Sequence, residues 1–137
     1  MKIVVDENMP YGREAFSTLG DVVAMPGRSI DAAAVADAEL LAIRSVTKVN
    51  ARLLDGSRVR FVGTATIGED HVDTAYLEAK GIRFSSAPGC NANSVGQYIT
   101  GALLELAQAH GFQLRGMKLG IVGVGNVGSR VLKKATA

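Results

Sequence analysis

The stretch Gly120-Ile121-Val122-Gly123-Val124-Gly125-Asn126-Val127-Gly128 places three glycines at the spacing G-x-G-x-x-G, directly after an apolar run. The run Met117–Val122 predicts a buried strand, and Ser129–Lys134 predicts the start of a helix. Strand, glycine turn and helix in this order are typical of dinucleotide-binding proteins, in which a pyrophosphate lies at the helix N-terminus. The stretch therefore predicts a nucleotide cofactor site.

Each glycine of this turn has a separate expected role. Gly123 permits the tight turn, Gly125 lets the backbone approach a pyrophosphate, and Gly128 lets the helix pack closely on the strand. The acidic residue that contacts the adenine ribose normally follows about 20 residues later, which lies beyond Ala137, so the sequence does not distinguish NAD from NADP. Because a nucleotide fold needs more chain than this, we interpret the sequence as the front part of a larger enzyme.

The composition favours an α/β protein with buried strands. The 137 residues are 47% hydrophobic, include 16 glycines and have a mean hydropathy of +0.19. No apolar run of about 18 residues predicts a membrane span, and the first residues do not resemble a signal peptide. The formal charge of +2, from 15 basic and 13 acidic residues without a basic stripe, argues against a nucleic-acid surface. A single cysteine gives no sign of export, so a cytoplasmic location is expected.

Short apolar runs alternate with helical patterns along the first part of the chain, which predicts a parallel sheet with helices on both faces. The expected strands are 2–5, 21–25, 40–43, 60–63 and 82–85, and the expected helical segments are 11–19, 31–37, 50–54 and 73–80. The residues 93–110 follow helical spacing and predict the longest helix, which Gly111 is placed to end. We expect a domain boundary directly after it, dividing the chain into residues 1–111 and 112–137.

Two loops rich in hydroxyl groups follow predicted strands. The residues Arg44-Ser45-Val46-Thr47-Lys48 combine hydroxyls with a guanidinium and an ammonium, and Gly63-Thr64-Ala65-Thr66-Ile67-Gly68 follows the next strand. Such loops suit a carboxylate or phosphate, and ligands of open α/β sheets bind beyond the carboxyl ends of the strands. One such loop by itself is better explained as an ordinary solvated turn, but two at one sheet edge favour an anion site.

Two further segments carry reactive residue types without predicting a site. Asp70-His71-Val72-Asp73 suggests a metal or acid–base centre, but a chain with two histidines gives a metal cluster little support. Instead, Asp73 is predicted to cap the following helix, with His71 helping to hold the turn. Cys90 has no base indicated nearby and is predicted to pack in the interior.

Taken together, several blocks resemble the D-isomer-specific 2-hydroxyacid dehydrogenases, and the resemblance covers nearly the whole chain. The blocks are Val5–Pro10, Arg44–Asn50, Phe61–Thr66, Asp70–Asp73, Ala87–Ala92 and Gly120–Gly128. The resemblance implies a flavodoxin-like parallel-sheet substrate domain followed by the start of a Rossmann NAD-binding domain. It also implies a cytoplasmic homodimer that uses NAD to oxidise a phosphorylated hydroxy acid.

The resemblance also assigns residues. The substrate contacts that it implies are Ser45 and Thr66, and the cofactor contacts are Gly123, Gly125, Asn126, Val127 and Gly128. The catalytic arginine, glutamate and histidine of the family are expected beyond Ala137, so no catalytic residue and no metal ligand is assigned. Two alternatives stay open: a family member that acts on phosphoglycerate or glycerate, and a regulatory relative that binds NAD(H) without turnover.

Overall fold

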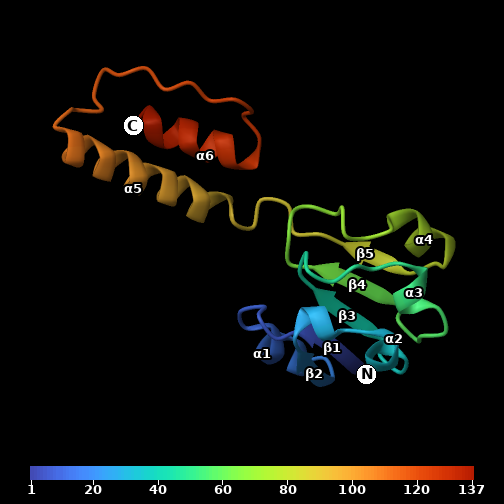
Figure 1. Ribbon diagram of the computed structural model, residues 1–137. Coiled ribbons are helices and arrows are strands. Elements are labelled where there is room, and N and C mark those ends of the chain that lie inside the picture. Colours follow the sequence, from blue (N-terminus) through green and yellow to red (C-terminus); the bar gives the residue numbers. More distant parts are fainter. The chain divides into compact units, whose positions relative to one another are not determined.

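The computed structural model describes all 137 residues, and they divide into two compact units. The first unit is Met1–Ala87, drawn in blue to yellow in Figure 1, and the second is Pro88–Ala137. The predicted division of the chain into residues 1–111 and 112–137 as substrate and cofactor domains stays a prediction. No helix in either unit is long and apolar enough to cross a membrane.

The first unit contains a five-stranded parallel sheet with the strand order β2-β1-β3-β4-β5. The strands are β1 (Lys2–Asp6), β2 (Asp21–Met25), β3 (Leu40–Ile43), β4 (Phe61–Thr64) and β5 (Arg83–Ser85). This is the strand order of flavodoxin-like folds, as the family resemblance implies. All five predicted strands are confirmed, each within a residue or so at its ends.

Short helices connect the strands. They are α1 (Gly12–Ser17), the 3₁₀ turn η1 (Gly27–Ser29), α2 (Ala32–Val35), α3 (Ala51–Leu54) and α4 (Thr74–Ala79). Asp31 and Asp73 accept hydrogen bonds at 2.9 Å from the backbone nitrogens of Ala34 and Tyr76, which confirms Asp73 as a helix cap. Helix α1 begins one residue later than the predicted residues 11–19, because Tyr11 has a φ of +58°, in the left-handed region that a helix cannot continue through, and it ends at Ser17, two residues before the predicted end.

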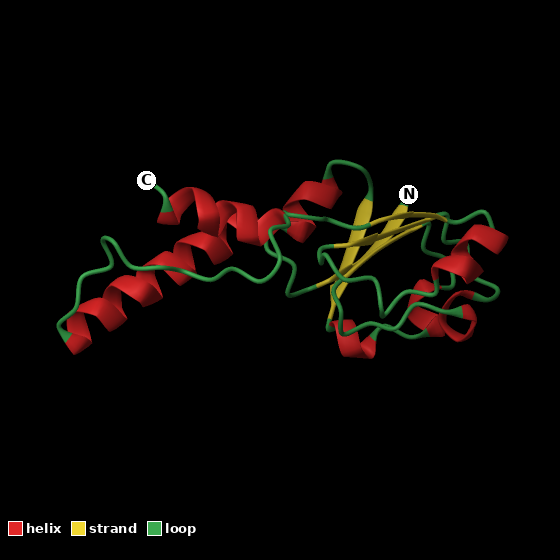
Figure 2. Ribbon diagram, turned by 90° about the horizontal axis from the view of Figure 1, so that it is seen from above, coloured by secondary structure: helices red, strands yellow, loops and turns green.

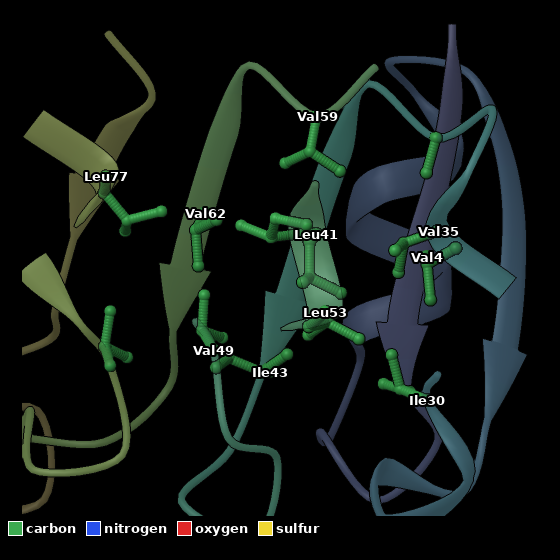
Figure 3. Packing of buried hydrophobic residues seen from close by; sticks show 13 residues of the cluster. Val4, Ile30, Val35, Leu41, Ile43, Val49, Leu53, Val59, Val62 and Leu77 are labelled. Atoms are coloured by element: carbon green, nitrogen blue, oxygen red, sulfur yellow. The ribbon is translucent and has the colours of Figure 1, made fainter. Parts of the chain in front are cut away.

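Buried side chains cover both faces of the sheet, so the prediction of helices on both faces is confirmed (Figure 2). On one face Val4, Leu41 and Val62 from the strands meet Val35, Leu53 and Leu77 from α2, α3 and α4 (Figure 3). On the other face a smaller cluster of Ile3, Val5, Leu40 and Ala42 packs against Phe16 of α1. All four residues of β3 are buried, as expected of a central parallel strand.

The second unit contains two helices, α5 (Ala92–His110) and α6 (Asn126–Ala135). Helix α5 matches the predicted residues 93–110 and ends at Gly111, which has a left-handed φ of +68°. The two helices approach closely at Gly96, where a Cβ atom would lie 3.1 Å from the Cβ of Arg130. A side chain larger than glycine at this position would therefore require Arg130 to shift by a few tenths of an ångström.

The predicted strand Met117–Val122 is wrong for this structure, because these residues form an irregular segment between α5 and α6. Met117, Leu119 and Val122 are exposed. A parallel strand is stable only when neighbouring strands take up its N–H and C=O groups, and the second unit contains no sheet. The apolar pattern of a strand is present, but the partners that would turn it into a strand are not in this unit.

Candidate functional site

The polar residues singled out in the first unit lie at the carboxyl edge of the sheet. Because the strands are parallel, all of their carboxyl ends meet at this edge. Ile43 of β3 pairs with Thr64 of β4, so Ser45 and Thr66, each two residues further on, leave the sheet at neighbouring positions. Ser45 is exposed and Thr66 is half-buried. The two predicted substrate contacts thus lie on adjacent loops, both open to solvent.

An ion pair between a buried carboxylate and a partly exposed arginine anchors the first of these loops. The side chain of Asp6, at the end of β1, is fully buried and accepts three hydrogen bonds. Arg44 donates to it twice, from Nε to Oδ2 at 3.0 Å and from Nη2 to Oδ1 at 3.3 Å, and the backbone nitrogen of Asn8 donates to Oδ1 at 2.9 Å. This forked contact joins the carboxyl ends of β1 and β3. The guanidinium of Arg44 is one of the groups that make this loop suit an anionic ligand, and in this structure it donates to Asp6.

Gly27 packs against this ion pair and completes the anchor. A Cβ atom at Gly27 would overlap the Asp6 carboxylate and lie 2.8 Å from Cγ2 of Val46, so only glycine fits here. The buried hydroxyl of Thr47 donates to the carbonyl oxygen of Gly27 at 2.8 Å. In the loop predicted to hold an anion, Arg44 and Thr47 therefore face the interior, whereas the side chains of Ser45 and Lys48 are exposed.

The second loop is organised around the hydroxyl of Thr64, which is buried at the end of β4. Oγ1 of Thr64 lies 2.7 Å from Oγ1 of Thr66 and 3.1 Å from Nε2 of His71. Thr66 in turn donates to the carbonyl oxygen of Gly68 at 3.2 Å. His71 therefore helps to hold this turn, as the sequence predicts. Burial lowers the pKa of His71, and the negative charges of Asp70 and Glu69 oppose that shift.

Two residues of this edge are not predicted from the sequence as parts of a site. Asp6 follows the apolar residues of β1, and its partner Arg44 lies 38 residues away, so no local pattern joins them. In the sequence, Thr64 is only one of the hydroxyl-bearing residues of its loop. The signal that could have identified Thr64 is its place on the same face of β4 as Val62, which is fully buried. A hydroxyl group buried there requires a hydrogen-bond partner.

The glycine turn in the second unit has the features that its motif predicts. Gly123 has a φ of +88°, and a Cβ atom at Gly128 would overlap the carbonyl oxygen of Gly123. Around Gly125, no atom lies within 4 Å of the place that a Cβ would occupy. Helix α6 begins directly after Gly125, with no side-chain cap and no acidic residue in its first turn. Free N–H groups beside an open backbone fit a pyrophosphate.

A second turn lies beside the N-terminus of α6. Gly89, with a φ of +78°, lies so close to Asn126 that a Cβ there would be 3.1 Å from Cγ of the asparagine. Asn126 itself is exposed, and Val127 is half-buried. Cys90 is exposed as well, so its predicted place in the interior is wrong. The turn that carries it lies on the surface, where a thiol has no apolar surroundings to pack against.

Comparisons with known proteins identify the class. The sequence profile described as D-isomer specific 2-hydroxyacid dehydrogenase, catalytic domain, matches residues 3–133. A protein of Klebsiella pneumoniae named erythronate-4-phosphate dehydrogenase is 60% identical over 137 residues, which are 100% of this chain and 36% of that protein. The protein of the same name from Chromohalobacter salexigens is 59% identical over 134 residues, 98% of this chain and 35% of its own. The chain belongs to the D-isomer-specific 2-hydroxyacid dehydrogenase family and spans little more than a third of these relatives' length.

Solved structures agree with the fold. A protein from Thermus thermophilus matches 99% of this chain and 53% of its own with a TM-score of 0.81 and 20% identity. The 3-phosphoglycerate dehydrogenase of Entamoeba histolytica, solved with NAD⁺ bound, matches 99% of this chain and 50% of its own with a TM-score of 0.74 and 27% identity. The α/β fold predicted from the sequence is confirmed.

The Asp6–Arg44 ion pair leads to a first prediction. Replacing Asp6 with alanine removes the acceptor of three hydrogen bonds, two of them from a guanidinium that remains partly buried. We expect Asp6→Ala to lower the free energy of unfolding by about 1.5–3 kcal/mol, the range for hydrogen bonds to charged groups. Urea unfolding followed by circular dichroism measures this loss. Glu7→Ala, at the exposed neighbouring residue, is the control, and equal losses in both variants would contradict the anchoring role.

The position of His71 predicts a pH dependence. Because burial lowers its pKa in the folded chain, the neutral ring is favoured there, and the unfolded chain binds the proton more readily. Its contribution to the free energy of unfolding is therefore complete above the ordinary pKa of about 6.5 and is lost as the pH falls from that value through the lower pKa of the folded chain. Urea unfolding across this range should show the loss in the unmodified chain and in His110→Gln. In His71→Gln the loss should be smaller, and an identical pH profile would contradict the prediction.

Proposed function

We propose that this chain supplies the substrate-binding part and the first cofactor-binding turn of an NAD-dependent erythronate-4-phosphate dehydrogenase. The reaction is the oxidation of 4-phospho-D-erythronate to 3-hydroxy-2-oxo-4-phosphooxybutanoate, a step in pyridoxal phosphate biosynthesis. The observation that carries the proposal is the pair of exposed loops at Ser45 and Thr66, on adjacent strands of one sheet edge. The names of relatives about 60% identical to this chain support the choice of substrate.

The substrate would bind through the hydroxyl groups of Ser45 and Thr66. Both can donate a hydrogen bond to a carboxylate or phosphate oxygen. The Asp6–Arg44 pair holds the Ser45 loop, and Thr64 holds Thr66, so both donors are positioned before a ligand arrives. Preorganised donors lose less conformational freedom on binding. These residues bind and orient; no catalytic residue is assigned in this chain.

The cofactor would bind at Gly123, Gly125, Asn126, Val127 and Gly128. The N–H groups at the start of α6 would hold its pyrophosphate, and the absence of a side chain at Gly125 leaves that approach open. When bound, the nicotinamide supplies the acceptor for the hydride that leaves the substrate carbon. NAD is favoured over NADP by the NAD⁺-bound phosphoglycerate dehydrogenase, whereas a related glyoxylate/hydroxypyruvate reductase from Sinorhizobium meliloti uses NADPH. A cytoplasmic homodimer is part of the proposal.

A fusion protein tests the proposal directly. This chain is joined to the part of the Klebsiella pneumoniae relative that follows its matching segment, and NADH formation is followed by absorbance. We expect oxidation of 4-phosphoerythronate with NAD, and little with 3-phosphoglycerate or glycerate. Preference for one of those two acids would favour the sister-enzyme alternative. NADH binding without turnover of any of the three would favour the regulatory alternative.

The substrate contacts can be separated from the cofactor contacts by mutation. In the fusion protein, Ser45→Ala and Thr66→Ala should each raise the KM for 4-phosphoerythronate by about 10- to 150-fold, because a hydrogen bond to a charged group contributes about 1.5–3 kcal/mol. The KM for NAD should not change. Ser17→Ala, at the end of α1 and the opposite edge of the sheet, is the matched control. Equal effects on substrate and NAD would contradict the assignment.

The glycine turn gives the complementary prediction. Gly125→Val adds a branched side chain where the pyrophosphate is expected to approach the backbone, so the dissociation constant for NAD should rise at least tenfold, about 1.4 kcal/mol. Fluorescence titration of the fusion protein with NADH measures the affinity, and circular dichroism checks the fold. Gly101→Val, also with no atom within 4 Å of its Cβ position, is the control. Unchanged NADH affinity in a folded Gly125→Val variant would make the turn purely structural.

A further inference from the structure

We propose that His71 is a positioning residue that directs the hydroxyl proton of Thr66 outward, toward an anionic ligand, through the buried hydroxyl of Thr64. The proposal rests on the proposed function, because it concerns one of the two substrate contacts assigned there. It assigns a role in substrate binding to a residue that does not itself contact the ligand. Three hydrogen bonds at the end of β4 carry it.

The direction of these hydrogen bonds follows from counting protons. A hydroxyl group has one proton to donate and can accept two hydrogen bonds. The proton of Thr66 is donated to the carbonyl oxygen of Gly68, at 3.2 Å. By distance alone, either hydroxyl could donate across the 2.7 Å contact between the two threonines; with the proton of Thr66 engaged at Gly68, the donor is Thr64. Thr64 is left to accept at 3.1 Å from Nε2 of His71, which must carry a proton.

The result is a one-way chain from the Nε2–H group of His71 to Thr64, from Thr64 to Thr66, and from Thr66 to Gly68. The side chain of Thr64 is largely closed to water, and its only partners in the chain are Thr66 and His71. The reverse order, from Thr66 to Thr64 and from Thr64 to an unprotonated Nε2, would also satisfy Thr64, but it would leave the contact between Thr66 and the carbonyl oxygen of Gly68 without a proton. Through Thr64, the N–H donor of His71 therefore sets the direction of the hydrogen bond between Thr64 and Thr66.

The backbone of His71 is held independently of its ring. Its carbonyl oxygen accepts from the backbone nitrogen of Val49 at 2.8 Å, and the nitrogen of Asp73 donates to the carbonyl of Val49 at 2.9 Å. Val49 and Val72 form an isolated parallel bridge. This bridge connects the turn at His71 to the segment that follows the Ser45 loop. The imidazole is thus fixed at the end of β4, beside Thr64.

The chain of hydrogen bonds has a consequence for ligand choice. With His71 donating inward, the proton of Thr66 points away from Thr64, and an anionic oxygen can replace the carbonyl of Gly68 as its acceptor. Without the donor at His71, Thr66 is free to turn its proton toward Thr64 and present only lone pairs to a ligand. Lone pairs repel a carboxylate or phosphate oxygen. His71 therefore favours an anionic acceptor at Thr66.

Variants in the fusion protein test this role by their effect on KM. His71→Phe and Thr64→Val remove the donor and the relay, and each should raise the KM for 4-phosphoerythronate by about 3- to 10-fold, as expected for one hydrogen bond. The KM for NAD should not change. His71→Gln keeps a side-chain N–H donor and should restore most of the affinity. A KM increase that is equal for substrate and NAD would overturn the proposal.

A double-mutant cycle separates positioning from a general structural effect. Once Thr66→Ala has removed the hydroxyl, adding His71→Phe should raise the KM for 4-phosphoerythronate no further. Multiplicative effects of the two substitutions would show that His71 acts independently of Thr66 and would overturn the proposal.

A measurement without substrate keeps this test distinct from that of the proposed function. Long-range ¹H–¹⁵N spectra of the 137-residue chain, recorded above the pKa of His71, report which ring nitrogen carries the proton. We expect the Nε2–H tautomer, and a shift toward a tautomer mixture in Thr64→Val. An Nδ1–H tautomer in the unmodified chain would overturn the relay even if the fusion protein oxidises 4-phosphoerythronate. The expected tautomer would support the relay even if the fusion protein prefers another acid.

Discussion

The parallel pairing of β1, β3 and β4 is the constraint on which the candidate site depends. It aligns three carboxyl ends at one edge, so that Asp6 and Arg44 come from separate parts of the sequence and still meet, and Thr64 lies beside Ile43 at the same edge. The central strand β3 is buried over its whole length, which fixes this register by hydrophobic packing on both faces. A shift by one residue would place apolar side chains of β3 on different faces and separate Ile43 from Thr64.

Within that frame, two buried polar groups set the geometry of the exposed ones. The Asp6–Arg44 pair need not make the fold more stable than an apolar pair would, because both charges lose water on burial. What it does is join two strand ends and hold the Ser45 loop. In the same way, the buried hydroxyl of Thr64 holds Thr66 through the contact between their two hydroxyl groups. In both loops, a buried partner limits the conformations of a side chain that is open to a ligand.

The second unit shows how far local chemistry can form the glycine turn of the proposed cofactor site without a sheet. The glycine turn depends on the φ of Gly123 and on the close approach of Gly128 to the Gly123 carbonyl, and both arise within six residues. Helix α6 then forms through its own hydrogen bonds. The apolar residues Met117–Val122 differ, because a strand forms its hydrogen bonds with neighbouring strands. In this unit the turn and the helix are formed and the strand is not.

The sequence by itself determined the features that depend on near neighbours: five strands, the long helix, the cap at Asp73 and the glycine turn. It also placed Ser45 and Thr66 beyond strand ends, since alternating strands and helices imply a parallel sheet with one carboxyl edge. The tertiary structure alone decided that Arg44 binds Asp6, that Thr64 joins His71 to Thr66, and that Cys90 is exposed. The physical reason is the distance along the chain between the residues that interact. Helical periodicity, caps and turns involve residues a few positions apart, whereas pairing across 38 residues depends on where separate strands end in space.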